Sequence, residues 1–357
     1  MRQHYLYGII SYKIELGADI VPEKPYVPPY SITDAIIHLV AEISEQVGIV
    51  TVKNESTVNP YLRRDNQIRT IHSSLAIENN SLSLEQVTDV INGKRVLGTP
   101  NEIREVKNAY EAYNHLLTFN PYSINDLLKA HKVLMMELTN ESGRFRSGGV
   151  DVYAGEKLVH MAPPADLVPK LVSDLLHWIK NTDTHPLIKS CIFHYEFEFI
   201  HPFSDGNGRM GRMWQSLLLS CWKSVFTWLP IETLIRERQN EYYDVLAIAD
   251  KAADSTVFIE FMLSIIRDAL SELIQTEQVR DQVTEQVERL MMVLGNDTLS
   301  AKELLERLGL KHRPTFSKNY LHPALELGLI EMTVPDKPNS SKQRYRAIKS
   351  FVREKCH

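Results

Sequence analysis

The stretch that decides the fold runs from residue 201 to residue 212 and reads His201-Pro202-Phe203-Ser204-Asp205-Gly206-Asn207-Gly208-Arg209-Met210-Gly211-Arg212. It predicts a loop that runs into a helix, because Gly206 and Gly208 allow backbone angles that other residues resist. Consecutive amides in such a loop form an anion-binding concavity, with the N-terminus of the next helix behind it. Arg209 and Arg212 are three residues apart and point to one side of that helix. The stretch therefore predicts a polyphosphate site.

Two further side chains of this stretch suggest chemistry at the bound phosphates. His201 stands at the entrance of the loop, where an imidazole takes a proton from an incoming hydroxyl at neutral pH. Asp205 supplies one carboxylate, which is enough for Mg²⁺ when the substrate phosphates supply further ligands. A lone Gly-x-Gly or a lone histidine is usually structural, so the functional interpretation rests on eight specified residues within twelve positions.

These eight residues resemble the signature of the Fic family, HxFx(D/E)GNGRxxR. The specified positions are His201, Phe203, Asp205, Gly206, Asn207, Gly208, Arg209 and Arg212. The resemblance implies a mainly α protein, with the Fic helical fold and a β-hairpin flap. It also implies an enzyme, a protein adenylyltransferase that transfers AMP from ATP to a Ser, Thr or Tyr hydroxyl of target proteins and of itself.

The resemblance also implies the roles of individual residues. His201 would be the catalytic base, Asp205 would bind Mg²⁺, and Phe203 would anchor the loop in the core. Asn207 and the loop amides would hold the α- and β-phosphates, Arg209 would stabilise the leaving pyrophosphate, and Arg212 would hold the γ-phosphate. The implied ATP-binding residues are Asp205, Gly206, Asn207, Gly208, Arg209, Met210, Gly211, Arg212, Tyr242 and Asp250. Because Gly208 and Arg209 are retained, nucleotidyl transfer is favoured over the phosphorylation performed by the Doc branch.

An upstream segment, Ser74-Leu75-Ala76-Ile77-Glu78-Asn79, looks like the family's inhibitory helix motif, (S/T)xxxE(G/N). A carboxylate at a helix end suits an arginine partner, and a pair between Glu78 and Arg212 would occupy the group needed for the γ-phosphate. Since the segment lies in the same chain, inhibition would be intramolecular. An ordinary helix-capping segment is the alternative.

Two weaker matches flank the signature. The segments Val150-Asp151-Val152-Tyr153 and 158–161 predict a hairpin across a four-residue loop containing Gly155, in the place of the family's target-docking flap. A simple surface hairpin is the alternative. Tyr242-Tyr243 resembles the aromatic pair near the adenine, with Asp250 where relatives often carry Asn; core packing is the alternative for both tyrosines.

The rest of the chain predicts helices and a separate C-terminal module. With 357 residues, 43% of them hydrophobic and 24% charged, the chain is long enough for two or three domains. The predicted divisions are an N-terminal region, 1–98, with the inhibitory helix at about 61–79; a Fic catalytic domain, 99–278; and a small α+β domain, 282–357. In residues 282–357, three helices are followed by two strands around a polar loop, which is the order of elements in a winged-helix domain.

Charge and composition limit which partners and which cellular compartment we expect. The net charge is −5, but residues 311–357 hold ten Lys/Arg and four Asp/Glu, which leaves −11 on residues 1–310. Three dispersed cysteines predict reduced thiols. No signal peptide is visible and no 18-residue run is uninterruptedly apolar, so we expect a cytoplasmic protein without a membrane span.

Candidate partners are ATP, a protein target with an exposed hydroxyl, a second copy of the chain, and DNA through residues 311–350. The last would use Lys311, Arg313, Lys318, Lys342, Arg344 and Arg346. A solvated basic face or a protein-docking module is the alternative. Two other functions remain open from the sequence: a nucleotide-sensing DNA-binding regulator, and an enzyme that removes AMP from modified proteins with Glu78 orienting a water molecule.

Overall fold

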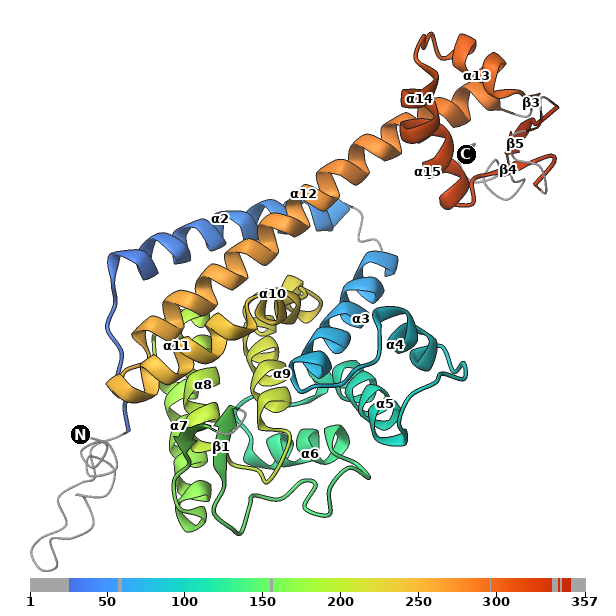
Figure 1. Cartoon of the computed structure of the whole chain (residues 1–357). Coiled ribbons are helices and arrows are strands. Elements are labelled where there is room, and N and C mark those ends of the chain that lie inside the picture. Colours follow the sequence, from blue (N-terminus) through green and yellow to red (C-terminus); the bar gives the residue numbers. More distant parts are fainter. Residues whose placement is uncertain are drawn as a thin grey trace, which may run out of the picture. The chain divides into compact units, whose positions relative to one another are not determined.

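The structure is a computed structural model and describes residues 26–56, 60–154, 157–295, 297–335, 340 and 342–347. Helices predominate throughout, so the predicted mainly α class is confirmed (Figure 1). The chain divides into two compact units, Met1–Glu272 and Leu273–His357. The predicted domain limits at 98/99 and 278/282 stay predictions.

The first unit is built from helices and one hairpin. Its elements are α2 (Asp34–Ser56), α3 (Pro60–Ile77), α4 (Leu84–Ile91), α5 (Pro100–Asn114), η2 (Leu116–Thr118), α6 (Ile124–Leu134), β1 (Asp151–Ala154), β2 (Lys157–Met161), η3 (Ala165–Leu167), α7 (Val168–Asn181), α8 (Pro186–Ile200), α9 (Asn207–Ser220), η4 (Ser224–Thr227), α10 (Ile231–Glu237), α11 (Gln239–Ala252) and the first part of α12 (Thr256–Leu294).

Helix α8 is the central helix of this unit. Eleven of its residues are buried, from Leu187 to Ile200, including the polar side chains of His194 and Glu196. A helix buried on all sides shows no apolar stripe, which is why its sequence is periodic in more than one way. It packs against α9, whose Trp214 is also fully buried. The motif therefore joins two buried helices that pack against each other, since it follows α8 and its second half forms the start of α9.

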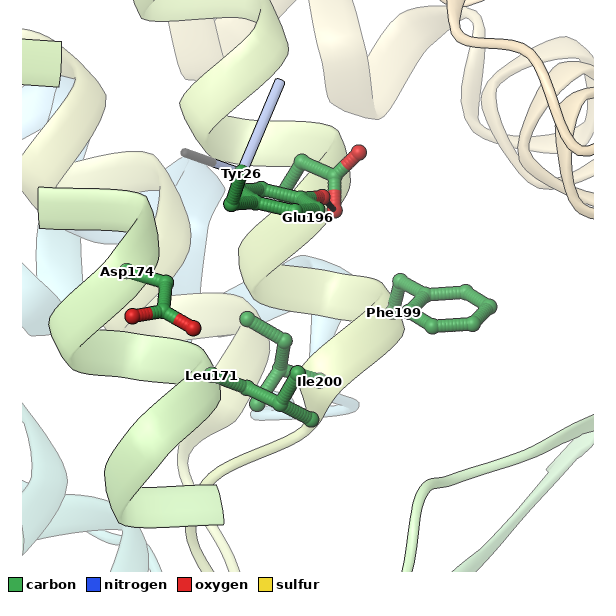
Figure 2. Close-up of a pocket in the computed structure, with 6 residues that line it drawn as sticks. All are labelled: Tyr26, Leu171, Asp174, Glu196, Phe199 and Ile200. Atoms are coloured by element: carbon green, nitrogen blue, oxygen red, sulfur yellow. Dashed lines mark hydrogen bonds between the residues drawn. The ribbon is translucent and has the colours of Figure 1, made fainter. Parts of the chain in front are cut away.

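The segment before α2 is extended and is fixed to the first unit by polar contacts. The Tyr26 hydroxyl donates to Glu196 Oε2 at 2.6 Å, and the Ser255 amide donates to the Pro29 carbonyl at 3.0 Å. Burial raises the pKa of Glu196 to about 7, although its bond to Tyr26 opposes the shift. A small pocket here is lined by Tyr26, Leu171, Asp174, Glu196, Phe199 and Ile200 (Figure 2). None of these six belongs to the 201–212 motif.

Helix α2 qualifies the expectation about membranes. Its stretch Asp34–Val52 has a mean hydropathy of 1.5, enough by length and composition alone for a membrane-crossing helix. The absence of an uninterrupted apolar run is therefore not sufficient to exclude one. In this structure α2 lies beside α12 (Figure 1), and Gln46 Nε2 donates to Ser271 Oγ at 2.7 Å. Helices of soluble proteins pass the same composition test, so it is weak evidence for a span.

The second unit contains the end of α12 and a small sheet. Its further elements are β3 (Thr298–Leu299), α13 (Ala301–Arg307), α14 (Arg313–Phe316), η5 (Ser317–Leu321), α15 (His322–Glu326), β4 (Ile330–Met332) and β5 (Tyr345–Ala347). The sheet is antiparallel with β5 between β3 and β4. Strand β3 has only two residues and was not expected from the sequence. The winged-helix assignment stays a prediction.

Two of the six basic residues proposed for DNA contact already have acidic partners. Arg344 Nη1 lies 3.2 Å from Glu303 Oε2, and Arg346 Nε lies 2.5 Å from Glu331 Oε1. Each pair neutralises a charge that a phosphate would need. DNA contact through 311–350 therefore stays a prediction, with less free positive charge than the sequence suggests.

Candidate active site

The first side chain of the motif stands where α8 ends. His201 follows Ile200 and takes left-handed backbone angles, φ 49° and ψ 61°, which cost about 1–2 kcal/mol for a residue with a Cβ atom. Its amide still donates to the Phe197 carbonyl at 3.0 Å. Its Nδ1 lies 3.3 Å from the Glu198 carbonyl oxygen, so Nδ1 carries the proton and the basic lone pair lies on Nε2.

The loop from 201 to 207 is closed by its own residues. The side chain of Asn207 bonds both backbone groups of Phe203: its Oδ1 accepts from the amide at 2.9 Å, and its Nδ2 donates to the carbonyl at 2.8 Å. Phe203 is fully buried and stacks on His131, with ring centroids 3.6 Å apart. Gly206 has φ +83°, and a Cβ atom there would lie 2.6 Å from Met135 Sδ. The loop is therefore rigid, and the Asn207 side chain serves the loop itself.

Helix α9 starts directly at this loop, and no side chain caps its first turn. Its first amides, from Asn207 onward, have no partner within the helix, and they form a natural anion site. Since both polar atoms of the Asn207 side chain are bonded to Phe203, any contact of this residue with phosphate falls to its backbone amide.

Arg212 on α9 is paired with the end of α3. It is 2% exposed, and its Nη2 donates to Glu78 Oε1 at 2.8 Å. Ser74 adds two bonds: its hydroxyl accepts from Nε at 3.1 Å and its carbonyl from Nη2 at 3.0 Å. Burial raises the pKa of Glu78, but the charges of Arg212, Arg209 and His201 outweigh it and lower that pKa overall. The Ser74–Asn79 segment thus contributes three hydrogen bonds to the buried guanidinium.

Gly208 lies under this ion pair. A Cβ atom at this position would be 2.3 Å from Glu78 Oε1 and 3.0 Å from Arg212 Nη1. Only a glycine leaves room for the carboxylate to reach the arginine across the first turn of α9.

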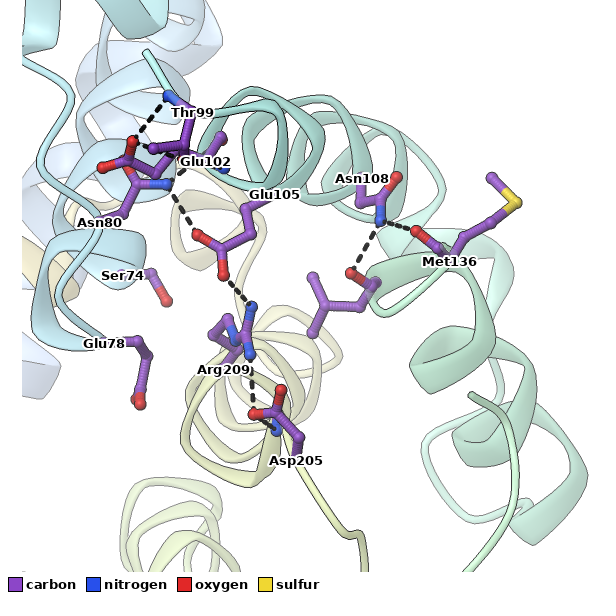
Figure 3. A network of polar contacts seen from close by, with 12 residues as sticks. Ser74, Glu78, Asn80, Thr99, Glu102, Glu105, Asn108, Met136, Asp205 and Arg209 are labelled. Carbon is purple, nitrogen blue, oxygen red and sulfur yellow. Dashed lines mark hydrogen bonds and ion pairs between the residues drawn. The ribbon is translucent and has the colours of Figure 1, made fainter. Parts of the chain in front are cut away.

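Arg209 is held between two other carboxylates (Figure 3). Its Nη1 lies 3.1 Å from Glu105 Oε1 on α5, and its Nη2 lies 3.0 Å from Asp205 Oδ1. Its side chain is 6% exposed, whereas that of Asp205 is 57% exposed. Both arginines of the motif are therefore buried and ion-paired, and Asp205 is the carboxylate most open to solvent.

The sequence and fold can now be compared with known proteins. The model of the Fic/DOC family matches residues 121–219, and that of the Filamentation induced by cAMP protein Fic-like, C-terminal domain, matches residues 285–347. The crystal structure of a Fic family protein from Desulfovibrio desulfuricans G20 is 58% identical, with a TM-score of 0.71, and the match covers 90% of this chain and 98% of that one. The chain belongs to the Fic family.

More distant members of the Fic family agree with this assignment. Protein adenylyltransferase Fic of Culex quinquefasciatus is 30% identical over 207 residues, which cover 55% of this chain and 39% of that protein. The chain thus matches about two fifths of the length of such curated relatives. Fic-1 (residues 134–508) of C. elegans is 22% identical with a TM-score of 0.56, over 69% of this chain and 72% of that one, and shows the shared fold.

The Fic residues predicted to lie near adenine differ in exposure. Tyr242 on α11 is 2% exposed and its hydroxyl lies 3.0 Å from His194 Nε2, so it is a core residue, as the alternative had it. Tyr243 is 38% exposed, and its hydroxyl accepts from Gln239 Nε2 at 3.4 Å. Asp250 is half-buried two turns further along α11. Of the tyrosine pair, Tyr243 is the more accessible to a ligand.

The predicted hairpin is present, and its role as a target-docking flap stays a prediction. Strands β1 and β2 pair antiparallel from Asp151↔Met161 to Ala154↔Lys157, with a register shift between Val152 and Tyr153. Pairing to the last residue of β1 makes the connection shorter than the predicted four residues. Gly155 and Glu156 of that connection lie outside the described residues.

The chemistry of Asp205 fits one Mg²⁺ ligand. The described residues contain no cluster of three or more His, Cys, Asp or Glu side chains that could hold a metal ion. A single exposed carboxylate suits Mg²⁺, which takes one or two carboxylates and completes its octahedron with phosphates and water. Asp205 Oδ1 accepts a hydrogen bond from the Gly206 amide at 2.6 Å, and this bond fixes the Asp205 carboxylate at the start of the anion site.

Sequence reasoning missed two residues that hold the catalytic loop from outside. Arg146 is 3% exposed, and it donates from Nε to the His201 carbonyl at 2.7 Å and from Nη1 to the Gly148 carbonyl at 2.9 Å. Its Nη2 donates to the carbonyl of Pro163. Arg146 therefore joins the left-handed turn at His201 to the chain just before and just after the flap. It lies outside any motif, so the sequence carried no signal for it.

His131 is the second such residue. The Gly143 amide donates to its Nδ1 at 2.9 Å, so its Nε2 carries the proton and donates to the Asp205 carbonyl at 3.0 Å. Burial lowers the pKa of His131 to about 4, and the bond to the Asp205 carbonyl opposes this only in part. The loop is thus clamped by a neutral imidazole.

This clamp predicts a pH-dependent stability. Between pH 4 and 6.5 the unfolded chain protonates His131 and the folded chain does not, so stability falls as the pH falls through this window. The control is His131→Gln, which keeps a donor and an acceptor but does not titrate. Relative to this variant, the free energy of unfolding of the wild type should fall by about 3 kcal/mol between pH 7 and pH 4.

Urea unfolding followed by tryptophan fluorescence measures this, because all four tryptophans lie in the first unit. A constant difference between the two proteins across this pH range would contradict a neutral clamp.

Proposed function

We propose that this chain is a protein adenylyltransferase that moves AMP from ATP to a Ser, Thr or Tyr hydroxyl, on target proteins and on itself, and that Glu78 holds it inactive. The observation that carries the proposal is the closed loop with a histidine at one end and the uncapped start of α9 at the other. The first supplies a base, and the second supplies amides for phosphate.

The reaction assigns one role to each group. The target hydroxyl gives its proton to His201 Nε2 as its oxygen attacks the α-phosphorus of ATP. The bond from the α-phosphorus to the bridging oxygen breaks, and pyrophosphate leaves with that electron pair. Amides at the start of α9 and the Arg209 guanidinium stabilise the charge on the phosphates. Mg²⁺ held at Asp205 with the nucleotide would neutralise further phosphate charge.

Inhibition follows from the competition for Arg212. With Glu78 on the guanidinium, an incoming γ-phosphate meets a like charge and lacks its cation, so ATP binds in an unproductive pose. Phosphoryl and nucleotidyl transfer depend mainly on positioning, so a misplaced triphosphate reacts poorly even when it is bound.

We expect Glu78→Gly to raise self-labelling strongly. A charge-assisted hydrogen bond contributes about 1.5–3 kcal/mol, so the gain should be roughly ten- to hundred-fold. Transfer of label from α-³²P-ATP to the chain measures it. Adding Arg212→Ala should cancel the gain, because the γ-phosphate then has no clamp.

Neighbouring serines give a matched control for this experiment. Ser74→Ala removes a hydroxyl that bonds Arg212 and should release the enzyme weakly. Ser73→Ala removes a hydroxyl that faces Thr233 instead and should not release it. A Glu78→Gly protein that folds, binds ATP and labels no faster than wild type would refute the inhibitory role.

We expect His201→Ala, made in the Glu78→Gly background, to abolish transfer and to leave ATP binding nearly unchanged. The substitution removes the base but not the amides that bind phosphate. Intact-protein mass spectrometry should show no added AMP, and calorimetry should still detect ATP. Undiminished transfer would remove His201 from the mechanism.

A further inference from the structure

Helix α5 carries a row of polar side chains, one of which contacts the 201–212 motif (Figure 3). Glu102, Glu105 and Asn108 are three residues apart, so they lie along one face of the helix. Each has a separate task. Glu102 bonds Ser81 and the N-cap residue Thr99, and Asn108 donates to the carbonyl at the end of α6. Glu105, between them, is the member that reaches the motif.

The Glu105 carboxylate is held from two sides. One oxygen pairs with Arg209, and the other accepts from Asn80 Nδ2 at 2.7 Å. Asn80 is fixed in turn, because its Oδ1 accepts from the Leu82 amide and its Nδ2 also reaches the Glu102 carbonyl. The side chain of Glu105 is 20% exposed. It is therefore placed firmly enough to orient a guanidinium.

Arg209 also pairs with Asp205, and this second pair creates a conflict on nucleotide binding. A cation at Asp205 would take the carboxylate that Arg209 now contacts and would repel the guanidinium. Glu105 is then the carboxylate that still holds Arg209, on the side away from Asp205. Without Glu105 the guanidinium would stay on Asp205 and compete with the cation.

We propose that Glu105 is a positioning residue that draws Arg209 away from Asp205, so that Asp205 can take Mg²⁺ and Arg209 can meet the phosphates. The proposal rests on the proposed function, since it assumes a nucleotide at the start of α9. It also gives Asn80 a role. This residue, two positions after Glu78, fixes the end of the inhibitory segment to the same carboxylate that orients Arg209.

The test compares two glutamates of α5 in the Glu78→Gly background. Glu105→Gln removes the charge facing Arg209. Glu102→Gln removes a carboxylate charge one turn earlier, whose hydrogen bonds go to Ser81 and Thr99 and not to the motif. The measured quantity is the affinity for ADP by calorimetry, with Mg²⁺ and with EDTA. This readout does not require the enzyme to transfer AMP.

We expect Glu105→Gln to weaken ADP binding about ten-fold in Mg²⁺ and less than two-fold in EDTA, and to raise the Mg²⁺ concentration that gives half-maximal self-labelling. Glu102→Gln should lower the melting temperature and leave both quantities unchanged. Glu105→Asp keeps the charge on a shorter side chain, so its ADP affinity in Mg²⁺ should lie between that of the background protein and that of Glu105→Gln. The aspartate variant also provides the test if Glu105→Gln does not fold.

An equal loss of ADP affinity with and without Mg²⁺, or an equal effect of Glu102→Gln, would overturn the role of Glu105. A background protein that binds ADP in a Mg²⁺-dependent way but never transfers AMP would refute the proposed function alone. A background protein that does not bind ADP would overturn both.

Discussion

A buried guanidinium needs an anion, and the site is organised around this requirement. Arg212 is 2% exposed, and removing the partner of a buried charge costs about 3–5 kcal/mol. In the present structure Glu78 is that partner, and in the proposed reaction the γ-phosphate of ATP takes its place. In the function we propose, Glu78 and the γ-phosphate therefore compete for one buried arginine, because either one satisfies its charge.

The hydrogen bonds that hold the rest of the site do not depend on which anion pairs with Arg212. His201 is held in its left-handed conformation by Arg146, the loop is closed by Asn207, and Asp205 is tied through its carbonyl to a neutral His131. None of these bonds involves Glu78 or Arg212. Glu78 can therefore leave Arg212 without breaking the hydrogen bonds that hold His201 and the loop.

The parts of the site that could be predicted from sequence are those that are contiguous. The residues of the 201–212 motif and of the Ser74–Asn79 segment have fixed spacings, because each lies on one loop or one helix end. Arg209 and Glu105 are 104 positions apart, His131 and Asp205 are 74 apart, and Arg146 and His201 are 55 apart. Such contacts depend on how the helices pack, so the sequence separation of the two residues does not predict them.

Burial explains the remaining differences from expectation. Helix α8 is buried on most sides, so the hydrophobic periodicity of its sequence does not distinguish it from a strand, and Pro186 in its first turn is the local signal for a helix. Tyr242 and Tyr243 are adjacent, yet one is a core residue and the other faces solvent. Adjacent residues on a helix point about 100° apart, and the sequence does not reveal which of them meets the interior.

The glycine under the ion pair limits which substitutions could abolish the proposed inhibition by Glu78. A side chain at Gly208 would push Glu78 off Arg212, but it would fill the same space above the first turn of α9 that a phosphate needs. Release and inactivation are therefore linked at this position. Under the inhibition that we propose, substitutions that release the enzyme and keep it active are therefore expected in α3 and the turn after it, and not at Gly208.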